Sequence, residues 1–369
     1  MPEHIGIHIH DLPTPCLIID LDVFVLNIAV MQSFAQSAGK ALRPHAKSHK
    51  CTIIARSQVA AGAVGISAAT VFEVETLIRA GITGVLLTGP VVGPHAIARL
   101  LDCREHDPSF LAVADSPEHA RLLNAAAQDR GIVLDVLLDL DVGLQRTGVP
   151  PDGALDAAAR IADLSALRFR GIQAYAGHIQ HIAGWEERRR ASLACMETAA
   201  GIVRRLRDEG LPCDILSGAG TGTHDIDATV PELTELQVGS YVLMDAEYLA
   251  IGSPGSAEFT AFRPALFLLA TVVSTHHAGF VSIDAGLKAL YRDGAVPRVV
   301  APRIPGLVYD WFGDEFGKLI LPEGVRMKPG DKVELVVSHC DPTVSMFDRF
   351  YMARNGKVVD VWEIDMRRR

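Results

Sequence analysis

The sequence lacks the features that mark membrane, secreted and nucleic-acid-binding proteins. No apolar run reaches the roughly 20 residues that span a bilayer. The opening MPEHIGIHIHDLPTP has neither the basic nor the apolar segment of a signal peptide. Lysine and arginine number 35 against 44 acidic residues, which gives a formal net charge of −9. This acidic balance argues against nucleic acid or an anionic membrane as the main partner.

Cysteine is scarce, and its spacing excludes two further classes. The six cysteines show no CxxC pair, so the sequence predicts neither a disulfide framework nor a zinc ribbon. We therefore expect a cytoplasmic protein. Its 369 residues, 49% of them hydrophobic, suit one large domain and a smaller one. The cysteines are Cys16, Cys51, Cys103, Cys195, Cys213 and Cys340.

The chain from about residue 42 to 245 alternates short strand-like runs with amphipathic helical segments. Several of the strands are apolar throughout, as expected for strands covered on both faces, and many helical segments close with glycine. Eight such strands favour an α/β fold, a (β/α)8 TIM barrel over 22–250. An open doubly wound sheet is the alternative, but no Gly-x-Gly-x-x-Gly follows the first strand. The expected strands are 41–46, 63–69, 84–89, 110–115, 133–141, 169–177, 213–220 and 236–245.

After about residue 255 the pattern becomes strands separated by turns. This predicts a C-terminal antiparallel β-domain over 255–369, and Asn355-Gly356 marks a hairpin within it. An early strand within 12–21 precedes the barrel and is expected to pair into this second domain. The other expected strands are 265–275, 279–286, 317–324, 331–339 and 349–365.

Polar and titratable residues recur at the carboxyl ends of the expected barrel strands, where such barrels place their sites. The segment LRPHAKSHKC ends the first strand with His45 and Lys47. A solvated charge run would explain that segment by itself. Polar residues also recur at the ends of later strands, however, and this recurrence favours a functional site. The later residues are Asp139, Asp141, Arg146, Tyr175, His178, His181, the SGAGTGT turn of 217–223 and Gly239-Ser240-Tyr241.

Two turns of small residues predict a phosphate site. SGAGTGT follows one apolar strand and QVGSY the next, and glycine-rich turns offer backbone N–H groups to phosphate. With a lysine ending the first strand, this suggests pyridoxal phosphate, bound covalently by Lys47. Arg146 would face the cofactor ring or the substrate carboxylate, unless it pairs with Asp139 or Asp141. The predicted cofactor-binding residues are His45, Lys47, Arg146, Tyr175, Ser217, Gly218, Gly220, Thr221, Gly222, Thr223, Gly239, Ser240 and Tyr241.

The SHCDPT segment, 338–343, predicts a metal site. On a strand, His339 and Asp341 would project to the same face, because side chains alternate. An imidazole and a carboxylate, completed by water, suit a divalent cation such as Mn²⁺ or Mg²⁺. Cys340 would point the other way. A histidine satisfied near a turn is the simpler alternative.

Seven segments taken together resemble the D-threonine aldolases, within the fold-type III pyridoxal phosphate enzymes that include alanine racemase. The resemblance runs from about residue 12 to 364 and is specific only in combination. The segments are PTPCLIIDLD, RPHAKSHK, DVGLQRTGV, IQAYAGHIQH, SGAGTGT, ELQVGSYVLMD and SHCDPT.

The resemblance implies roles for residues at the matching positions. Lys47 matches the cofactor-binding lysine, His339 and Asp341 match the metal ligands, and His181 matches a histidine near the substrate hydroxyl. The implied reaction cleaves D-β-hydroxy-α-amino acids to glycine and an aldehyde in a homodimer. One departure stands out: Phe316, in GDEFG, replaces a family histidine, which would alter the preferred substrate, while Asp314 remains as a partner.

Other functions stay open at this point. A D-3-hydroxyaspartate aldolase would share the reaction. A D-serine or 3-hydroxy-D-aspartate dehydratase usually carries His-x-Cys at the metal motif, so His339-x-Asp341 favours the aldolase. Alanine racemase fits less well, because racemisation needs no metal pair. A non-catalytic pyridoxal phosphate-binding protein would lack the β-domain.

Overall fold

The structure is a computed structural model that describes residues 4–292 and 294–367. The chain divides into two compact units. The barrel unit consists of Met31–Lys47 and Thr52–Gly239. The sheet unit consists of Met1–Val30, Ser48–Cys51 and Ser240–Arg369.

Within the described residues the barrel unit is built on eight parallel strands in the order β2-β9-β8-β7-β6-β5-β4-β3. The two ends of this order meet, because Leu42 and Pro44 accept hydrogen bonds from the N–H groups of Val64 and Ser67, both at 2.8 Å. This closure confirms the predicted barrel. The strands are β2 (Ala41–Leu42), β3 (Ser67–Ala68), β4 (Leu86–Leu87), β5 (Leu111–Ala114), β6 (Leu134–Asp139), β7 (Leu167–Ala174), β8 (Ile215–Gly218) and β9 (Glu235–Leu236).

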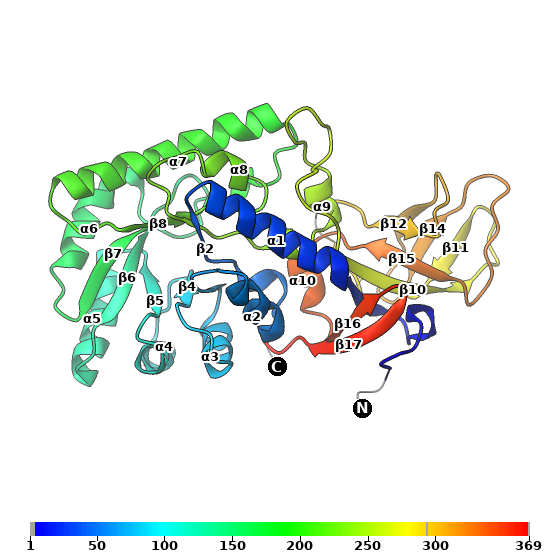
Figure 1. Cartoon of the computed structure of the whole chain (residues 1–369), viewed down its shortest axis with the longest axis horizontal. Helices are drawn as coiled ribbons and strands as arrows, with labels where there is room; N and C mark the ends of the chain where they lie inside the picture. Colours follow the sequence, from blue (N-terminus) through cyan, green and yellow to red (C-terminus); the bar gives the residue numbers. More distant parts are fainter. Residues whose placement is uncertain (1–3, 293, 368–369) are drawn as a thin grey trace. The chain divides into compact units, whose positions relative to one another are not determined.

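Helices connect the barrel strands and cover them on the outside (Figure 1). Local signals set their ends: Thr70 and Glu73 form a capping box at the start of α3, and Gly131 ends α5 with φ +66°. None of the helices within the described residues is long and apolar enough to cross a membrane. The helices are α1 (Leu21–Ser37), α2 (Thr52–Ala60), α3 (Val71–Arg79), α4 (Pro94–His106), α5 (Pro117–Arg130), α6 (Ala154–Ala162), α7 (Trp185–Asp208) and α8 (His224–Asp227).

Burial explains why the barrel strands are continuously apolar rather than alternating. Every residue of β5 and β6 is buried, since one face of each strand packs into the barrel and the other against helices. The few polar residues on these strands cluster where the strands end. Asp139, the last residue of β6, is one of them.

Within the described residues the sheet unit is a largely antiparallel β-structure of nine strands. β1 lies between β10, with which it pairs antiparallel, and β16, with which it pairs parallel. Asn355 and Gly356, both with positive φ, form the hairpin between β16 and β17. Two short helices, α9 (Ala246–Leu249) and α10 (Cys340–Val344), also belong to this unit. Its strands are β1 (Cys16–Asp20), β10 (Leu266–Ser274), β11 (Phe280–Ile283), β12 (Arg298–Ala301), β13 (Val308–Trp311), β14 (Gly317–Ile320), β15 (Lys332–Val336), β16 (Arg349–Arg354) and β17 (Lys357–Glu363).

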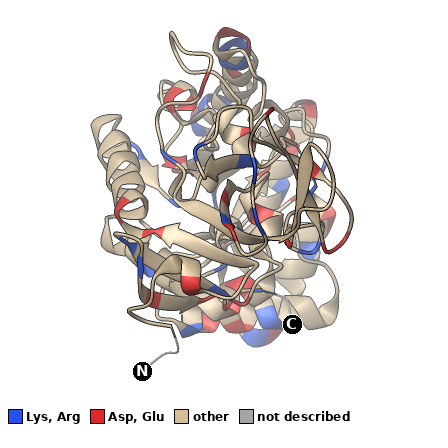
Figure 2. Cartoon of the chain, turned by 90° about the vertical axis from the view of Figure 1, so that its right-hand side faces the viewer, with Lys and Arg blue, Asp and Glu red and all other residues tan. Residues whose placement is uncertain are grey.

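The structure differs from the sequence-based expectations at several strands. The strand expected over 331–339 ends at Val336, and 236–245 is a strand only to Leu236. The expected strand 41–46 is regular only to Leu42, although the N–H of His45 still bonds to Val238. The sequence analysis missed β12 and β13. Acidic and basic residues are interspersed along the ribbon in Figure 2, so the net charge is distributed over the chain.

Candidate functional site

Lys47, Arg146 and Tyr175 meet at the carboxyl ends of three barrel strands. The Lys47 Nζ lies 5.7 Å from the centre of the Tyr175 ring, and the Arg146 guanidinium carbon lies 6.0 Å from it. Lys47 is half-buried in a 3-10 turn (Ala46–Ser48), Tyr175 follows β7, and Arg146 is exposed in the loop after β6. Two cations converging on one aromatic ring form a site that fits an anionic, planar ligand.

A buried polar network lies at the strand ends of the barrel. Gln173 donates to Asp139 at 2.8 Å and to the Thr88 carbonyl at 2.9 Å. Gln237 donates to Gln173 and to Ser217. Burial raises the pKa of Asp139, while its hydrogen bonds from Gln173 and Thr147 oppose that shift. His45 joins the same layer, because its Nε2 lies 3.1 Å from the Thr88 hydroxyl.

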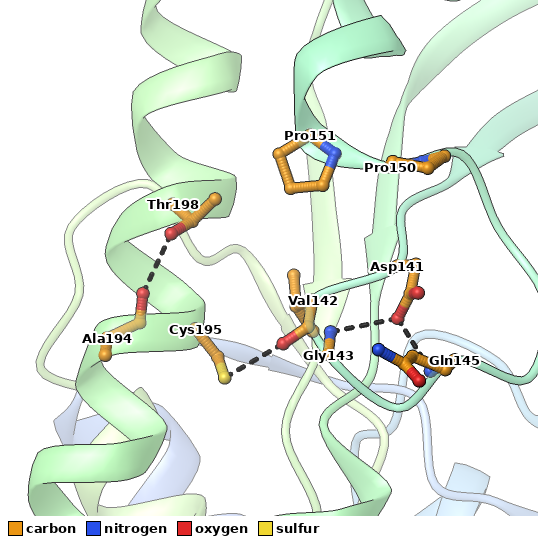
Figure 3. A pocket seen from close by; sticks show the side chains of 9 residues that line it. All are labelled: Asp141, Val142, Gly143, Gln145, Pro150, Pro151, Ala194, Cys195 and Thr198. Carbon is orange, nitrogen blue, oxygen red and sulfur yellow. Dashed lines mark hydrogen bonds between the residues drawn. The ribbon is translucent and has the colours of Figure 1, made fainter.

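The loop that carries Arg146 has its own anchors. Asp141 accepts hydrogen bonds from the N–H groups of Gly143 and Gln145, and these donors, Gln145 above all, lower the pKa of Asp141. The Cys195 thiol donates to the Val142 carbonyl at 3.1 Å. A surface pocket of about 510 Å³ lies between this loop and α7, as Figure 3 shows.

The alternative ion pair from Arg146 to an aspartate is not formed. Asp141 binds backbone N–H groups of its own loop, and Asp139 binds Thr147 and Gln173. Within the portion of the chain that the structure describes, Arg146 forms no ion pair with either carboxylate, although its charge opposes the rise in the pKa of Asp139. Arg146 therefore lies near the Tyr175 ring and within electrostatic range of Asp139.

The side chain of Gln180 supports the glycine-rich loop of 217–223, which begins at the end of β8. Gln180 accepts the N–H of Gly222 at 3.0 Å and donates to the Thr223 hydroxyl at 3.0 Å. At two of these positions close packing requires glycine, because any side chain would collide with neighbouring atoms. A Cβ on Gly218 would lie 2.2 Å from the Ala174 carbonyl oxygen, and one on Gly220 would lie 2.4 Å from the Gln180 Oε1. The loop holds a close-packed shape that larger residues would break.

The remaining residues of the predicted cofactor set have different settings. Thr221 and Thr223 are buried, and the Thr223 hydroxyl donates to Asp227 rather than outward. Gly239 is the last residue of the barrel unit, whereas Ser240 and Tyr241 begin the last segment of the sheet unit. The Tyr241 ring is buried there against Phe262, with 5.6 Å between ring centres.

The two histidines after β7 differ in exposure. His178 is exposed, and its ring approaches Gly143 of the Arg146 loop. His181 is half-buried and directly precedes Ile182, whose carbonyl accepts a hydrogen bond from Arg188 at 2.6 Å. This contact fixes the backbone beside His181.

A cluster of acids surrounds His339 in the sheet unit. The His339 Nδ1 lies 3.1 Å from an Asp245 carboxylate oxygen and 3.4 Å from one of Glu247. Burial alone would lower the pKa of His339, but the hydrogen bond with Asp245 and the charges of Asp341, Asp245 and Glu247 outweigh it and raise the pKa to about 9. The site therefore attracts positive charge, whether a proton or a metal ion.

The donor set of this cluster fits a hard divalent cation. Asp245, His339 and Cys340 offer ligand atoms within 4.8 Å of one another. Cys340 is the weakest of them, because burial above all raises its pKa well above the usual range and keeps the thiol protonated. Asp245 is fully buried and already accepts the N–H groups of Cys340 and Tyr248. Asp245 thus binds the Nδ1 side of the His339 ring and fixes its orientation.

The strand argument for His339 and Asp341 is wrong, because these residues are not on a strand. His339 is the N-cap residue of α10, and Asp341 lies in the first turn of that helix. Their proximity comes from the strand-to-helix junction. The charge of Asp341 still contributes to the raised pKa of His339.

Several residues of the site were missed in the sequence. They share one property: each is a buried or half-buried polar group whose partner is distant in the chain or hidden by the fold. No local motif reports such a pairing, although a buried polar residue beside an apolar run is a weak signal. The missed residues are Thr88, Gln173, Gln180, Arg188, Asp227, Gln237, Asp245 and Glu247.

Known proteins match both units. The alanine racemase, N-terminal domain family matches residues 19–247, and the family described as "Putative serine dehydratase domain" matches 265–353. A D-threonine aldolase of Arthrobacter sp. is 38% identical over 96% of this chain and 92% of its own length. A 3-hydroxy-D-aspartate aldolase of Paracoccus denitrificans is 34% identical over the whole chain and 95% of its own length. The crystal structure of a D-threonine aldolase from Filomicrobium marinum has a TM-score of 0.94 and 36% identity, covering 99% of this chain and 98% of that one.

The barrel, the antiparallel sheet and the lysine-tyrosine-arginine site define an alanine racemase-like enzyme of fold-type III, the pyridoxal phosphate type. Relatives that match this chain over nearly its full length identify one family within this class. The chain belongs to the D-threonine aldolase family, whose enzymes are aldehyde-lyases.

Proposed function

We propose that the protein is a pyridoxal phosphate- and divalent-metal-dependent D-threonine aldolase, which cleaves D-β-hydroxy-α-amino acids to glycine and an aldehyde. The observation that carries the proposal is the convergence of Lys47 and Arg146 on Tyr175. It occurs in a chain 38% identical to a D-threonine aldolase over nearly its whole length.

Most of the proposed cofactor-binding groups belong to the barrel unit. Pyridoxal phosphate, when bound, provides an electron sink for the electron pair left on Cα. Lys47 would hold it covalently, and Tyr175 would lie against its ring. Arg146 would orient a carboxylate or ring oxygen through its planar, permanently charged fork. We propose the phosphate contacts at Ser217, Gly218, Gly220, Thr221, Gly222 and Thr223 and at Gly239, Ser240 and Tyr241.

The sheet unit supplies the groups for a metal ion. A divalent ion, when bound, provides a Lewis acid for the substrate hydroxyl. His339 and Asp341 are the proposed ligands, and Asp245 orients the imidazole from its Nδ1 side. An imidazole with carboxylates favours Mn²⁺ or Mg²⁺ over softer ions.

Proton transfer is assigned to His181. The reaction needs a base that removes the β-hydroxyl proton as the Cα–Cβ bond breaks. The Arg188 contact to Ile182 restrains the backbone next to this histidine. A held imidazole transfers a proton more efficiently than a mobile one, because its approach to the hydroxyl is set in advance.

A substrate panel tests the proposal directly. Purified protein with pyridoxal phosphate and Mn²⁺ would be incubated with D-threonine, 3-hydroxy-D-aspartate and D-serine, and glycine, aldehyde and ammonia measured in parallel. Glycine and acetaldehyde in equal amounts from D-threonine are expected, with none from L-threonine. Ammonia without glycine would contradict the proposal and identify a dehydratase.

One second candidate has a specific observation behind it. The 3-hydroxy-D-aspartate aldolase match covers the whole chain at 34% identity. That enzyme would share the bond cleaved but prefer a substrate with a second carboxylate. A faster reaction with 3-hydroxy-D-aspartate than with D-threonine would favour it. A homodimer, a cytoplasmic location, and a functional division at 22–250 and 255–369 with 12–21 remain proposals.

A further inference from the structure

Three buried polar side chains lie behind the glycine-rich loop of 217–223, and the function proposed above gives none of them a role in binding the cofactor. Gln180, Arg188 and Asp227 are each at most 1% exposed. All three lie in the barrel unit. Burying an arginine, an aspartate and a glutamine together is costly unless each is fully engaged. Their contacts show what they are engaged with.

Gln180 connects to the loop through both ends of its amide. Its Oε1 accepts the N–H of Gly222 at 3.0 Å, and its Nε2 donates to the Thr223 hydroxyl at 3.0 Å and to the Ala176 carbonyl at 3.3 Å. The Oε1 also occupies the space that a Cβ on Gly220 would need. Gln180 is thus the template against which the turn is folded.

Arg188, near the start of α7, joins two segments. Its Nε donates to the Gly222 carbonyl at 2.8 Å, and its Nη1 donates to the Ile182 carbonyl at 2.6 Å. One guanidinium therefore holds the glycine-rich loop and the segment that carries His181 at a fixed separation. A lysine has one point of attachment and cannot reproduce this geometry.

Asp227 completes the cluster from α8. Its two carboxylate oxygens accept the hydroxyls of Ser192 and Thr223, both at 2.5 Å. Because Thr223 donates to Asp227, its hydroxyl oxygen faces the Gln180 amide and the Gly220 N–H as an acceptor. The three side chains form one connected network around Thr223 and Gly222.

We propose that Gln180, Arg188 and Asp227 are positioning residues that preform the 217–223 loop and thereby set the protein's affinity for the phosphate group of its cofactor. The proposal rests on the proposed function, since that function places the phosphate at this loop. It adds that the recognition is preorganised by side chains that do not touch the ligand.

The test separates phosphate recognition from general stability. Apoprotein would be titrated with pyridoxal phosphate and with pyridoxal, which lacks the phosphate, and both dissociation constants measured by absorbance. The quantity compared is the ratio of the dissociation constant for pyridoxal to that for pyridoxal phosphate. For Gln180→Leu we expect this ratio to fall at least about tenfold, with pyridoxal affinity nearly unchanged. Gln180→Glu keeps an acceptor for Gly222 but loses the donor to Thr223, so a smaller fall is expected.

A matched control comes from another buried arginine. Arg43 donates hydrogen bonds to the Glu235 carboxylate and to the Gly84 carbonyl. Glu235 is the first residue of β9, and Gly84 lies just before β4. Arg43→Met should lower stability yet keep the wild-type ratio, whereas Arg188→Met should lower the ratio. Folded Gln180 and Arg188 variants with the wild-type ratio would overturn the inference. A wild-type protein without preference for the phosphorylated form would instead overturn the proposed phosphate site, and the inference with it.

Discussion

Tyr175 presents its ring to two cationic side chains at once. Both Lys47 and Arg146 lie near the outer limit of about 6 Å for a cation–π contact, so the ring orients them at little energetic gain. Such a weak arrangement is easily exchanged for ligand contacts. It suits a lysine whose proposed role is to bond covalently to a ligand.

Lys47 gives the first prediction at the residue scale. Lys47→Ala should abolish both the visible absorption of the lysine-bound cofactor and catalysis, because only a primary amine forms that imine. The spectrum after reconstitution with pyridoxal phosphate checks this. A variant with unchanged absorbance and turnover would place the cofactor lysine elsewhere.

The acids around His339 give a second prediction at this scale. Asp341→Ala should weaken Mn²⁺ binding at least about tenfold, and Asp245→Asn should weaken it about 10–100-fold by releasing the imidazole. Cys340→Ser should leave Mn²⁺ affinity nearly unchanged, since the buried thiol stays protonated. Calorimetric titration measures all three.

Chelation provides the functional counterpart of those variants. Removing the metal should stop cleavage of D-threonine while the absorption of bound pyridoxal phosphate persists, and Mn²⁺ should restore the wild type but not Asp341→Ala. An unchanged rate after chelation would show that the ion has no part in the reaction.

At the scale of elements, Asp227 of α8, which contacts Thr223 of the glycine-rich loop, makes the stability of the fold depend on pH. Burial above all raises the pKa of Asp227 from 3.8 to about 6, although Ser192 and Thr223 oppose the shift. Between these values the folded protein keeps a proton that the unfolded chain has lost. The resulting stabilisation is fully present below about pH 4 and is lost as the pH rises through about 6.

Asp227→Asn removes this titration and so predicts a specific difference. From pH 4 to pH 7, the free energy of unfolding of the wild type should fall by about 2–3 kcal/mol relative to the variant. Urea unfolding at a series of pH values measures it. Parallel profiles for the two proteins would show that Asp227 does not titrate in this range.

The same elements show how far the sequence alone could be interpreted. The barrel strands were predictable because two-sided burial leaves a continuous apolar run, as in β5 and β6. β12 and β13 were not, since their residues are largely half-buried or exposed and carry no such pattern. For the site, Lys47, Arg146 and Tyr175 could be selected from the sequence because each lies at or after the end of an expected strand. Gln180 and Asp245 act through partners 42 and 94 residues away, a distance at which local patterns carry no information.

At the scale of the whole molecule, we expect a homodimer, as the family resemblance implies. Light scattering at assay concentration should report twice the chain mass of 39.7 kDa. Dilution should lower activity as dimers dissociate. A monomer with full activity under the same conditions would refute the expectation.

The position of β1 has a consequence for the order in which the protein is made. β1 pairs with β10 on one side and with β16 on the other, so Leu17 meets Leu268 and Phe350. A ribosome adding roughly 5–20 residues per second needs on the order of half a minute to travel from the first of these residues to the last. During that time an apolar strand that emerged early has no partner, while the barrel strands are synthesised one after another. Leu17, Ile18 and Ile19 therefore stay exposed until both of their partner strands have been made, and a chaperone that binds short apolar segments would find a target in β1 throughout that interval.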